Sequence, residues 1–433
     1  MTETKISGVT ATNIVVANMI GTGVFVSLGF QVIAIRSDFA IMALWLIGGL
    51  LSLCGALCYA ELAVALPRLG GEYNFLSRIY HPAVGFMAGW ISISIGFPAP
   101  IAIAAMAFGK YFLGMTPSVS PLFLSLMLVW IVTVIHLIGL RVGEKFQNIA
   151  TVIKIALILG LIIAGIFFSQ KQPLQLAPQP NDFGVMLSGP FAVSLIYVMY
   201  SYSGWNAASY ITAEVRRPER NVPWALFVGT VFVTVLYVLL NWVFLIAAPV
   251  SELSGQPQVG LIAGQHIFGP IGGVLTSDLI SLGLVASVSA MSWIGSRVTK
   301  SMADDFSRLR FFGRVNQQGT PHVAMLLQAL IVTALILTGS FEAVLVYTQF
   351  SLLLSSFLTV LGLIVLRIRQ PDLPRPYRVW AYPITPLIFL IVTLGMMVHA
   401  VQERTVESLL GLATALFGLV IYYFAAPSRA GLV

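Results

Sequence analysis

Lys154 stands out in this sequence because it lies within an apolar run, at about residues 145–168. If the run is helical, Lys154 stands about eight positions, or about 12 Å, beyond its start. An ammonium at that depth needs acceptors, since burying an unpaired charge in an apolar medium is costly. Backbone carbonyls and a hydroxyl could provide them. The alternative is that the long side chain extends to the aqueous end of its helix.

Two other apolar runs contain small and polar residues near their middles, where a helix could open. These segments read Met19-Ile20-Gly21-Thr22-Gly23-Val24 and Tyr200-Ser201-Tyr202-Ser203-Gly204-Trp205-Asn206. An opened helix presents unpaired N–H groups that favour an anion, and it frees carbonyls that suit a cation. The N–H groups expected to face an anion are those of Thr22, Gly23 and Val24. The carbonyls expected to face an ammonium are those of Met19, Ile20, Tyr200 and Ser201.

The composition places all these residues in a membrane. Of 433 residues, 58% are hydrophobic and 9% are charged, against about 25% charged in soluble domains. Apolar runs of about 20 residues are long enough to cross a bilayer as helices. We therefore predict an all-α membrane protein with about twelve spans, with the lipid bilayer as its solvent. The predicted spans are 8–32, 38–66, 82–113, 121–140, 145–168, 187–215, 222–248, 272–303, 322–338, 342–368, 382–402 and 405–425.

The distribution of charge predicts the orientation of these spans. The chain has a net charge of +7, and most of its 23 Lys and Arg residues flank one set of span ends. Basic residues accumulate on the cytoplasmic side of membrane proteins. We therefore expect a multi-pass protein of the cell inner (plasma) membrane with both termini in the cytoplasm. Topology accounts for the basic charge, so no nucleic acid partner is expected.

The two interrupted runs are predicted to be antiparallel, because five spans separate their starts. Paired interruptions in oppositely oriented halves are typical of inverted-repeat transporters with a site at the midplane. The repeats would be 1–168 (spans 1–5) and 187–368 (spans 6–10), followed by accessory helices at 382–425, all within one transmembrane domain. The residues leave another interpretation open, because glycines also permit close helix packing.

Further motifs occur in order along almost the whole chain. They include Tyr59-Ala60-Glu61-Leu62, Pro67-Arg68-Leu69-Gly70-Gly71-Glu72-Tyr73, Asn221-Val222-Pro223, Gly295-Ser296-Arg297 and Arg375-Pro376-Tyr377-Arg378. With the two interruptions, they make the sequence resemble the amino acid-polyamine-organocation superfamily, and most closely its L-amino-acid-transporter-like bacterial branch. The resemblance implies a 5+5 inverted-repeat, LeuT-like fold with helices 1 and 6 broken. His136 and the segment Asp305-Phe306-Ser307 depart from the family pattern.

The resemblance implies a site for a free amino acid, which is a zwitterion and needs both an anion site and a cation site. It places Tyr200 as an aromatic gate on the extracellular side, and Ser201, Ser203 and Asn206 beside the substrate. It also implies that the Lys154 ammonium bridges spans 1 and 8 where sodium-coupled relatives hold a cation. Ser289 is the span 8 hydroxyl expected to face span 1.

Several functions share these residues. Sodium-independent exchange of small neutral L-amino acids by alternating access is favoured. A neutral substrate is expected because no acidic residue falls within either interruption, and no sodium site is expected where Lys154 takes the place of the cation. Proton-coupled symport and a transport-inactive amino acid sensor are the alternatives. An enzyme is not expected, because the predicted spans contain no HExxH, GxSxG or paired-aspartate motif. No metal or cofactor is expected, and the sequence identifies no accessory subunit. Glu61 and Glu214 are expected to pair with arginines at the cytoplasmic helix ends.

Overall fold

The computed structural model describes residues 5–112, 119–169, 171–256, 258–338 and 341–425, and this part of the chain is almost entirely helical. The larger helices are α1 (Gly8–Met19), α2 (Gly23–Ala34), α3 (Asp38–Ala65), α5 (Pro82–Ile91), α6 (Pro98–Tyr111), α7 (Pro121–Ile138), α8 (Leu140–Phe168), α10 (Gly189–Tyr202), α11 (Pro218–Ala247), α13 (Val259–Asp305), α14 (His322–Thr338), α15 (Phe341–Arg369), α16 (Ile384–Glu403) and α17 (Thr405–Ala425). The short elements are α4 (Glu72–Ile79), the π-helical turn η1 (Ser92–Gly96), α9 (Asp182–Met186), the 3₁₀ helix η3 (Ala207–Glu214), α12 (Val250–Leu253) and η4 (Ser307–Gly313).

In the described residues, ten helical segments are long and apolar enough to cross a membrane. They confirm the multi-pass all-α class. Two of the twelve predicted spans are not among these ten, for reasons of length. α10 has only 14 residues because it ends at Tyr202, and α14 has 17.

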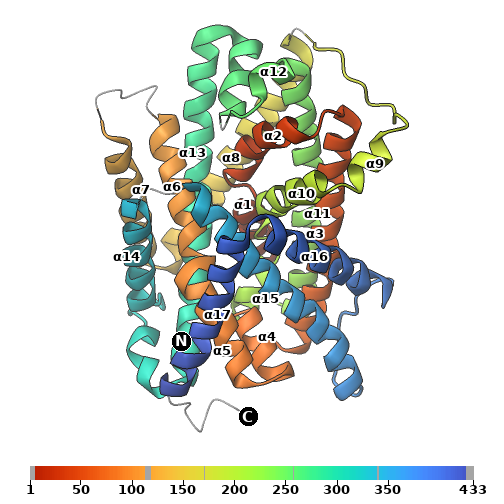
Figure 1. Cartoon of the computed structure of the whole chain (residues 1–433). Helices are drawn as coiled ribbons and strands as arrows, with labels where there is room; N and C mark the ends of the chain where they lie inside the picture. The colour runs from red at the N-terminus through yellow and green to blue at the C-terminus, as the bar shows by residue number, and fades with distance from the viewer. Residues whose placement is uncertain (1–4, 113–118, 170, 257, 339–340, 426–433) are drawn as a thin grey trace.

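The first and sixth predicted spans are interrupted and lie side by side at the centre of the molecule (Figure 1). Their close approaches run in opposite directions along the chain. A Cβ atom added at Gly204 would lie 2.8 Å from Asn18, and one at Gly23 would lie 2.5 Å from Ser201. Farther along, the Ser27 hydroxyl lies 3.5 Å from the Tyr197 carbonyl. Residue numbers that rise along the first span thus pair with residue numbers that fall along the sixth, so the two broken helices are antiparallel.

The inner part of the molecule is packed with large aromatic side chains, whereas its outside is apolar. Trp45, Tyr59, Tyr202 and Tyr237 are fully buried. Large apolar side chains are exposed on the outer helices, among them Phe123, Ile163, Ile391 and Phe417. Exposed apolar surface on this scale is unfavourable in water but matches hydrocarbon, so it identifies the lipid-facing surface.

The eighth predicted span, at 272–303, is part of a much longer helix. α13 extends from Val259 to Asp305 and changes direction at Gly269, which adopts φ +78° and precedes Pro270. A glycine tolerates this backbone conformation and a proline cannot continue the hydrogen-bond pattern, so the bend has a local cause. α13 contacts α1, α6 and α8, and Ser287, after the bend, reaches the Ile20 carbonyl beside the first broken helix.

Candidate binding site at the two broken helices

The break between α1 and α2 comprises Ile20, Gly21 and Thr22. Ile20 has an extended backbone that stops α1, and the Thr22 side chain makes no capping hydrogen bond to α2. The first N–H groups of α2 are therefore left without a side-chain acceptor from Thr22. No atom lies within 4 Å of a Cβ placed at Gly21, apart from its own neighbours in the chain. The break thus combines an N-terminal helix dipole with open space beside it, as an anion site requires.

Lys154 on α8 reaches this break and is only 2% exposed. Its Nζ atom donates to the carbonyl of Ile20 at 2.5 Å, to that of Ala17 at 3.2 Å and to the Ser287 hydroxyl at 2.6 Å. These three acceptors match the three N–H donors of an ammonium. The side chain therefore does not extend to the end of its helix; it ties the end of α1 to α13.

The expected contact between Lys154 and Ser289 is wrong. Ser289 is two positions farther along α13, which turns its side chain to the opposite face of the helix. There its hydroxyl lies 2.8 Å from Nε2 of His136. Ser287 takes the predicted place, since its Oγ contacts the Lys154 ammonium and also donates to the Ile20 carbonyl at 2.6 Å.

The second break follows Tyr202, where α10 ends. Ser203 is extended and Gly204 adopts φ +98° before the chain resumes in η3. This backbone favours glycine, and the close approach to Asn18 also excludes a side chain.

Tyr237 on α11 joins the two breaks, a role that sequence reasoning missed. Its hydroxyl lies 2.6 Å from the Met19 carbonyl and 3.0 Å from the Ser201 carbonyl. A hydroxyl has one proton, so it can donate to only one of these carbonyls at a time. The only sequence signal was a tyrosine near the middle of an apolar span.

A small cavity lies between the breaks, with about 280 Å³ of space not filled by atoms, open solvent included. Seven of the ten predicted substrate-binding residues line it, namely Met19, Gly21, Thr22, Gly23, Tyr200, Ser201 and Ser203. Ile20 and Val24 are not part of its lining. The Ile20 carbonyl already accepts from Lys154 and Ser287. Its two lone pairs are thereby filled, so it is not available to a substrate ammonium as the sequence suggested.

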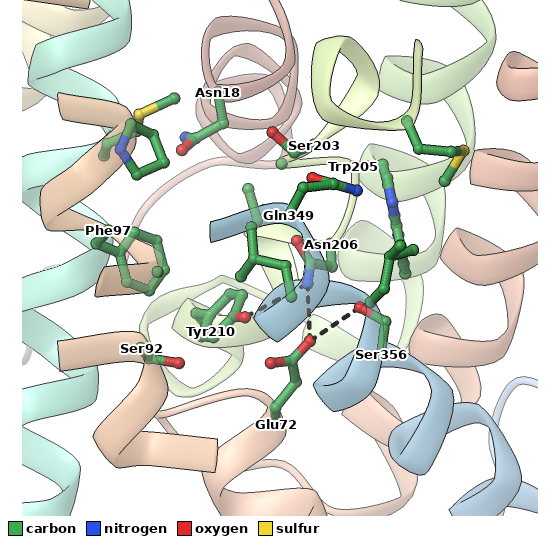
Figure 2. A pocket seen from close by; sticks show the side chains of 18 of the residues that line it. Asn18, Glu72, Ser92, Phe97, Ser203, Trp205, Asn206, Tyr210, Gln349 and Ser356 are labelled. Atoms are coloured by element: carbon green, nitrogen blue, oxygen red, sulfur yellow. Dashed lines mark hydrogen bonds between the residues drawn. The ribbon is translucent and has the colours of Figure 1, made fainter. Parts of the chain in front are cut away.

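Asn206 lines a second, larger cavity of about 750 Å³ instead. Both cavities are bordered by Asn18, Pro100, Ser203 and Met291, so the larger one adjoins the break. Figure 2 shows Asn206 pointing away from Asn18 and toward Glu72 and Tyr210. Its Nδ2 atom lies 3.3 Å from each of these two partners. Trp205 also lines this cavity, and it packs edge-on against Tyr59 with the ring centroids 4.8 Å apart.

Ion pairs gather at the ends of the helices where the expected cytoplasmic loops lie. Glu61 binds Arg367 at 2.6 Å, and Glu214 binds Arg297 at 3.1 Å, which confirms both expected pairings. Arg68 pairs with Asp305 across two further elements. A short backbone bridge between Ile6 and Val215 also joins the chain before α1 to the chain after η3. The Ile6–Val215 bridge and the Glu214–Arg297 pair fix the start of the first broken span and the end of the second.

Two antiparallel broken helices, with the buried Lys154 amino group beside them and a small cavity between them, are typical of a membrane transporter. Comparison with known proteins agrees. A family model described as amino acid permease matches residues 6–423, and the chain belongs to this family. The expected superfamily is thereby confirmed, and the family is one of transporters.

Relatives with assigned names extend along nearly the whole chain. The mouse b(0,+)-type amino acid transporter 1 is 26% identical over 420 residues, which cover 95% of this chain and 85% of that protein. The human large neutral amino acids transporter small subunit 2 is 27% identical over 429 residues, covering 97% and 80%. The mouse Asc-type amino acid transporter 1 is 27% identical over 432 residues, with the same coverage. All three are named as amino acid transporters.

Proposed function

We propose that this protein exchanges small neutral L-amino acids across the cell inner (plasma) membrane without sodium. The observation that carries the proposal is the position of Lys154. Its ammonium is bound by the freed carbonyls of α1 and by Ser287 of α13. A tethered positive charge there supplies what a dissociable cation would otherwise supply, so no sodium ion is needed to join these helices.

The substrate would bind in the cavity between the breaks. Its carboxylate would face the N–H groups at the start of α2, where the helix dipole favours negative charge. Its ammonium would face the Met19 and Ser201 carbonyls, which share one donor, the Tyr237 hydroxyl, and so retain acceptor capacity. The small volume of the cavity supports a small substrate.

Transport by this protein would be alternating access between two inverted repeats, residues 1–168 and 187–368, with residues 382–425 as accessory helices. The antiparallel packing of the two broken helices supports this division. The basic helix ends support a cytoplasmic position for the termini and for the ion pairs Glu61–Arg367 and Glu214–Arg297. These pairs would then separate when the site opens inward.

Tyr200 would act as the gate. It is 6% exposed, lines the break cavity and packs against Ile103. We expect Tyr200→Ala to raise the apparent KM for substrate by about 5- to 10-fold, the equivalent of 1 to 1.4 kcal/mol, with little loss of yield. Trp205→Ala is the comparison, because it removes a buried ring from between Tyr59 and Phe389. It should lower stability by about 3 to 5 kcal/mol.

Thermal unfolding and uptake kinetics of both variants measure the difference. If Tyr200→Ala also lost yield and left KM unchanged, the gate assignment would be wrong and Tyr200 would be a packing residue like Trp205.

Counterflow in proteoliposomes tests the proposed function. Vesicles containing the purified protein and unlabelled alanine should accumulate labelled alanine in potassium buffers, with equal pH on both sides. Accumulation that appears only with an inward proton gradient would favour symport. Alanine binding without any accumulation would favour a sensor.

A further inference from the structure

Glu72 is a buried acid that the proposed transport cycle does not yet use. It is the first residue of α4, the short helix that follows α3, and it is 1% exposed. The sequence placed it in a loop motif away from both interruptions. The structure brings it to the cavity that adjoins them, where its carboxylate points toward Asn206 and Tyr210 (Figure 2).

The hydrogen bonds of Glu72 are unevenly shared between its two oxygens. Oε1 accepts from the Tyr59 hydroxyl at 2.5 Å, from Asn206 at 3.3 Å and from Ser356 at 3.4 Å. Oε2 is buried and has no hydrogen-bond partner. No basic side chain of the described residues lies within ion-pairing distance of either oxygen. The network thus holds the carboxyl group in one orientation and leaves Oε2 without a donor.

The same cavity contains a second acceptor without a partner, Oε1 of Gln349 on α15. The aromatic rings of Phe97, Trp205 and Tyr210 form much of the remaining wall. A buried carboxylate costs free energy unless a positive charge or further donors accompany it. An ammonium has three donors and no acceptor, and aromatic faces also favour a cation. It is therefore the kind of group that this cavity lacks.

We propose that the Glu72 carboxylate binds the ammonium group of a transported amino acid in the cavity beside the break. The ammonium could have two sources. It could belong to the side chain of a basic amino acid whose α-carboxylate lies at the start of α2. It could instead be the α-ammonium of an amino acid that has left the break toward the cytoplasmic end. The proposal rests on the proposed transport function, and it qualifies the expectation of neutral substrates.

A proton competes with an ammonium for the Glu72 carboxylate. Burial raises the pKa of Glu72 to about 7, although its hydrogen bonds to Tyr59, Ser356 and Asn206 and the nearby Tyr210 hydroxyl oppose this rise. Among the described residues, the titratable side chains beside the carboxyl are Tyr59 of α3 and Tyr210 of η3, which supply no positive charge. An ammonium would therefore compete with a proton for Glu72. Its binding should weaken as the pH falls below about 7.

Lysine and norleucine are the probe pair, because they share a straight aliphatic chain and differ chiefly in the terminal ammonium. Their affinities, and that of alanine, would be measured with the purified protein and with Glu72→Gln. The control is Glu252→Gln, which alters an exposed acid paired with His266. Glu72→Asp keeps the negative charge, and it replaces Glu72→Gln in these measurements if Glu72→Gln does not fold.

If the side chain supplies the ammonium, Glu72→Gln should weaken lysine binding about tenfold or more and leave norleucine unchanged. If the α-ammonium supplies it, the transport KM measured in proteoliposomes should rise for every substrate at the cytoplasmic face alone. Unchanged values for all three ligands would overturn the proposal. So would a variant that changes only the pH dependence of uptake, since Glu72 would then be a proton site. In Glu72→Asp, which keeps the charge but shortens the side chain, lysine affinity should fall more than norleucine affinity, and equal losses for the two ligands would overturn the proposal.

These outcomes are separable from a failure of the proposed function. Binding in detergent does not require transport, so lysine discrimination by Glu72 can be tested even if counterflow fails. If alanine counterflow succeeds and Glu72→Gln changes no affinity, only the Glu72 proposal is lost.

Discussion

Lys154→Ala should reduce exchange about 10- to 100-fold. The substitution removes the donor of three hydrogen bonds from a buried site and leaves the Ala17 carbonyl without that partner. An unsatisfied buried acceptor costs about 1 to 3 kcal/mol, and here the cost falls on the contact between α1, α8 and α13. Since the substrate cavity lies on the other side of the break, alanine affinity should fall less than the rate. Initial rates and binding of purified variants measure this split.

Two serines on α13 provide matched controls for this prediction. Ser287→Ala removes one partner of Lys154 and should reduce exchange moderately. Ser289→Ala removes a hydroxyl of equal size that contacts His136 instead, so it should leave exchange near the wild-type rate. Equal losses from both serine variants, or full activity of Lys154→Ala, would exclude the tethered ammonium as a functional element.

Gly21→Val should abolish uptake while the protein still folds. Gly21 lines the break cavity, and a Cβ placed there meets no atom within 4 Å, so a branched side chain would stand in open space at the break. It would also restrict the open backbone that presents the α2 N–H groups. We expect alanine affinity to fall by more than about 100-fold, equivalent to about 2.7 kcal/mol, with the melting temperature retained.

Gly395→Val is the control, because its added Cβ also meets no atom within 4 Å and it lies on α16, away from both breaks. Gly23, which sequence reasoning places equally well, is a poorer test. Its Cβ would lie 2.7 Å from the Cα of Ser201 and would force α2 away from α10. Near-normal alanine affinity in Gly21→Val would mean that the substrate does not bind at this break.

The sequence was sufficient to predict the features that depend on the local pattern of residue types. Span length, the two interruptions and the depth of Lys154 in its helix all follow from positions of residue types along the chain. They predicted the antiparallel broken helices and a buried ammonium beside the first one. The contacts of Glu61 and Glu214 were also predictable, because opposite charges near the same helix ends have few other partners.

Features that depend on the packing of one element against another were not predictable. Ser287 and Ser289 differ only in which face of α13 they occupy, and that face is set by contacts with α1, α7 and α8. Tyr237 has no distinctive neighbours in the sequence, yet it joins both breaks. Glu72 follows a turn whose path decides that its carboxyl enters the cavity.

The contacts suggest how binding could be coupled to movement. Lys154, Ser287 and Tyr237 all attach to the last carbonyls of α1, while the substrate would attach to the first N–H groups of α2. A change in the angle between α1 and α2 would therefore alter both sets of contacts at once. The ion pairs at the inner ends would oppose that change until they separate.

The most direct test of the tethered cation is the affinity of the purified protein for alanine as sodium replaces potassium at constant ionic strength. The Lys154 ammonium already occupies the carbonyls of Ala17 and Ile20, so we predict one affinity at every sodium concentration, with zero sodium included. An affinity that rises with sodium and then saturates would contradict the account, because it would require a dissociable cation in addition to the fixed one.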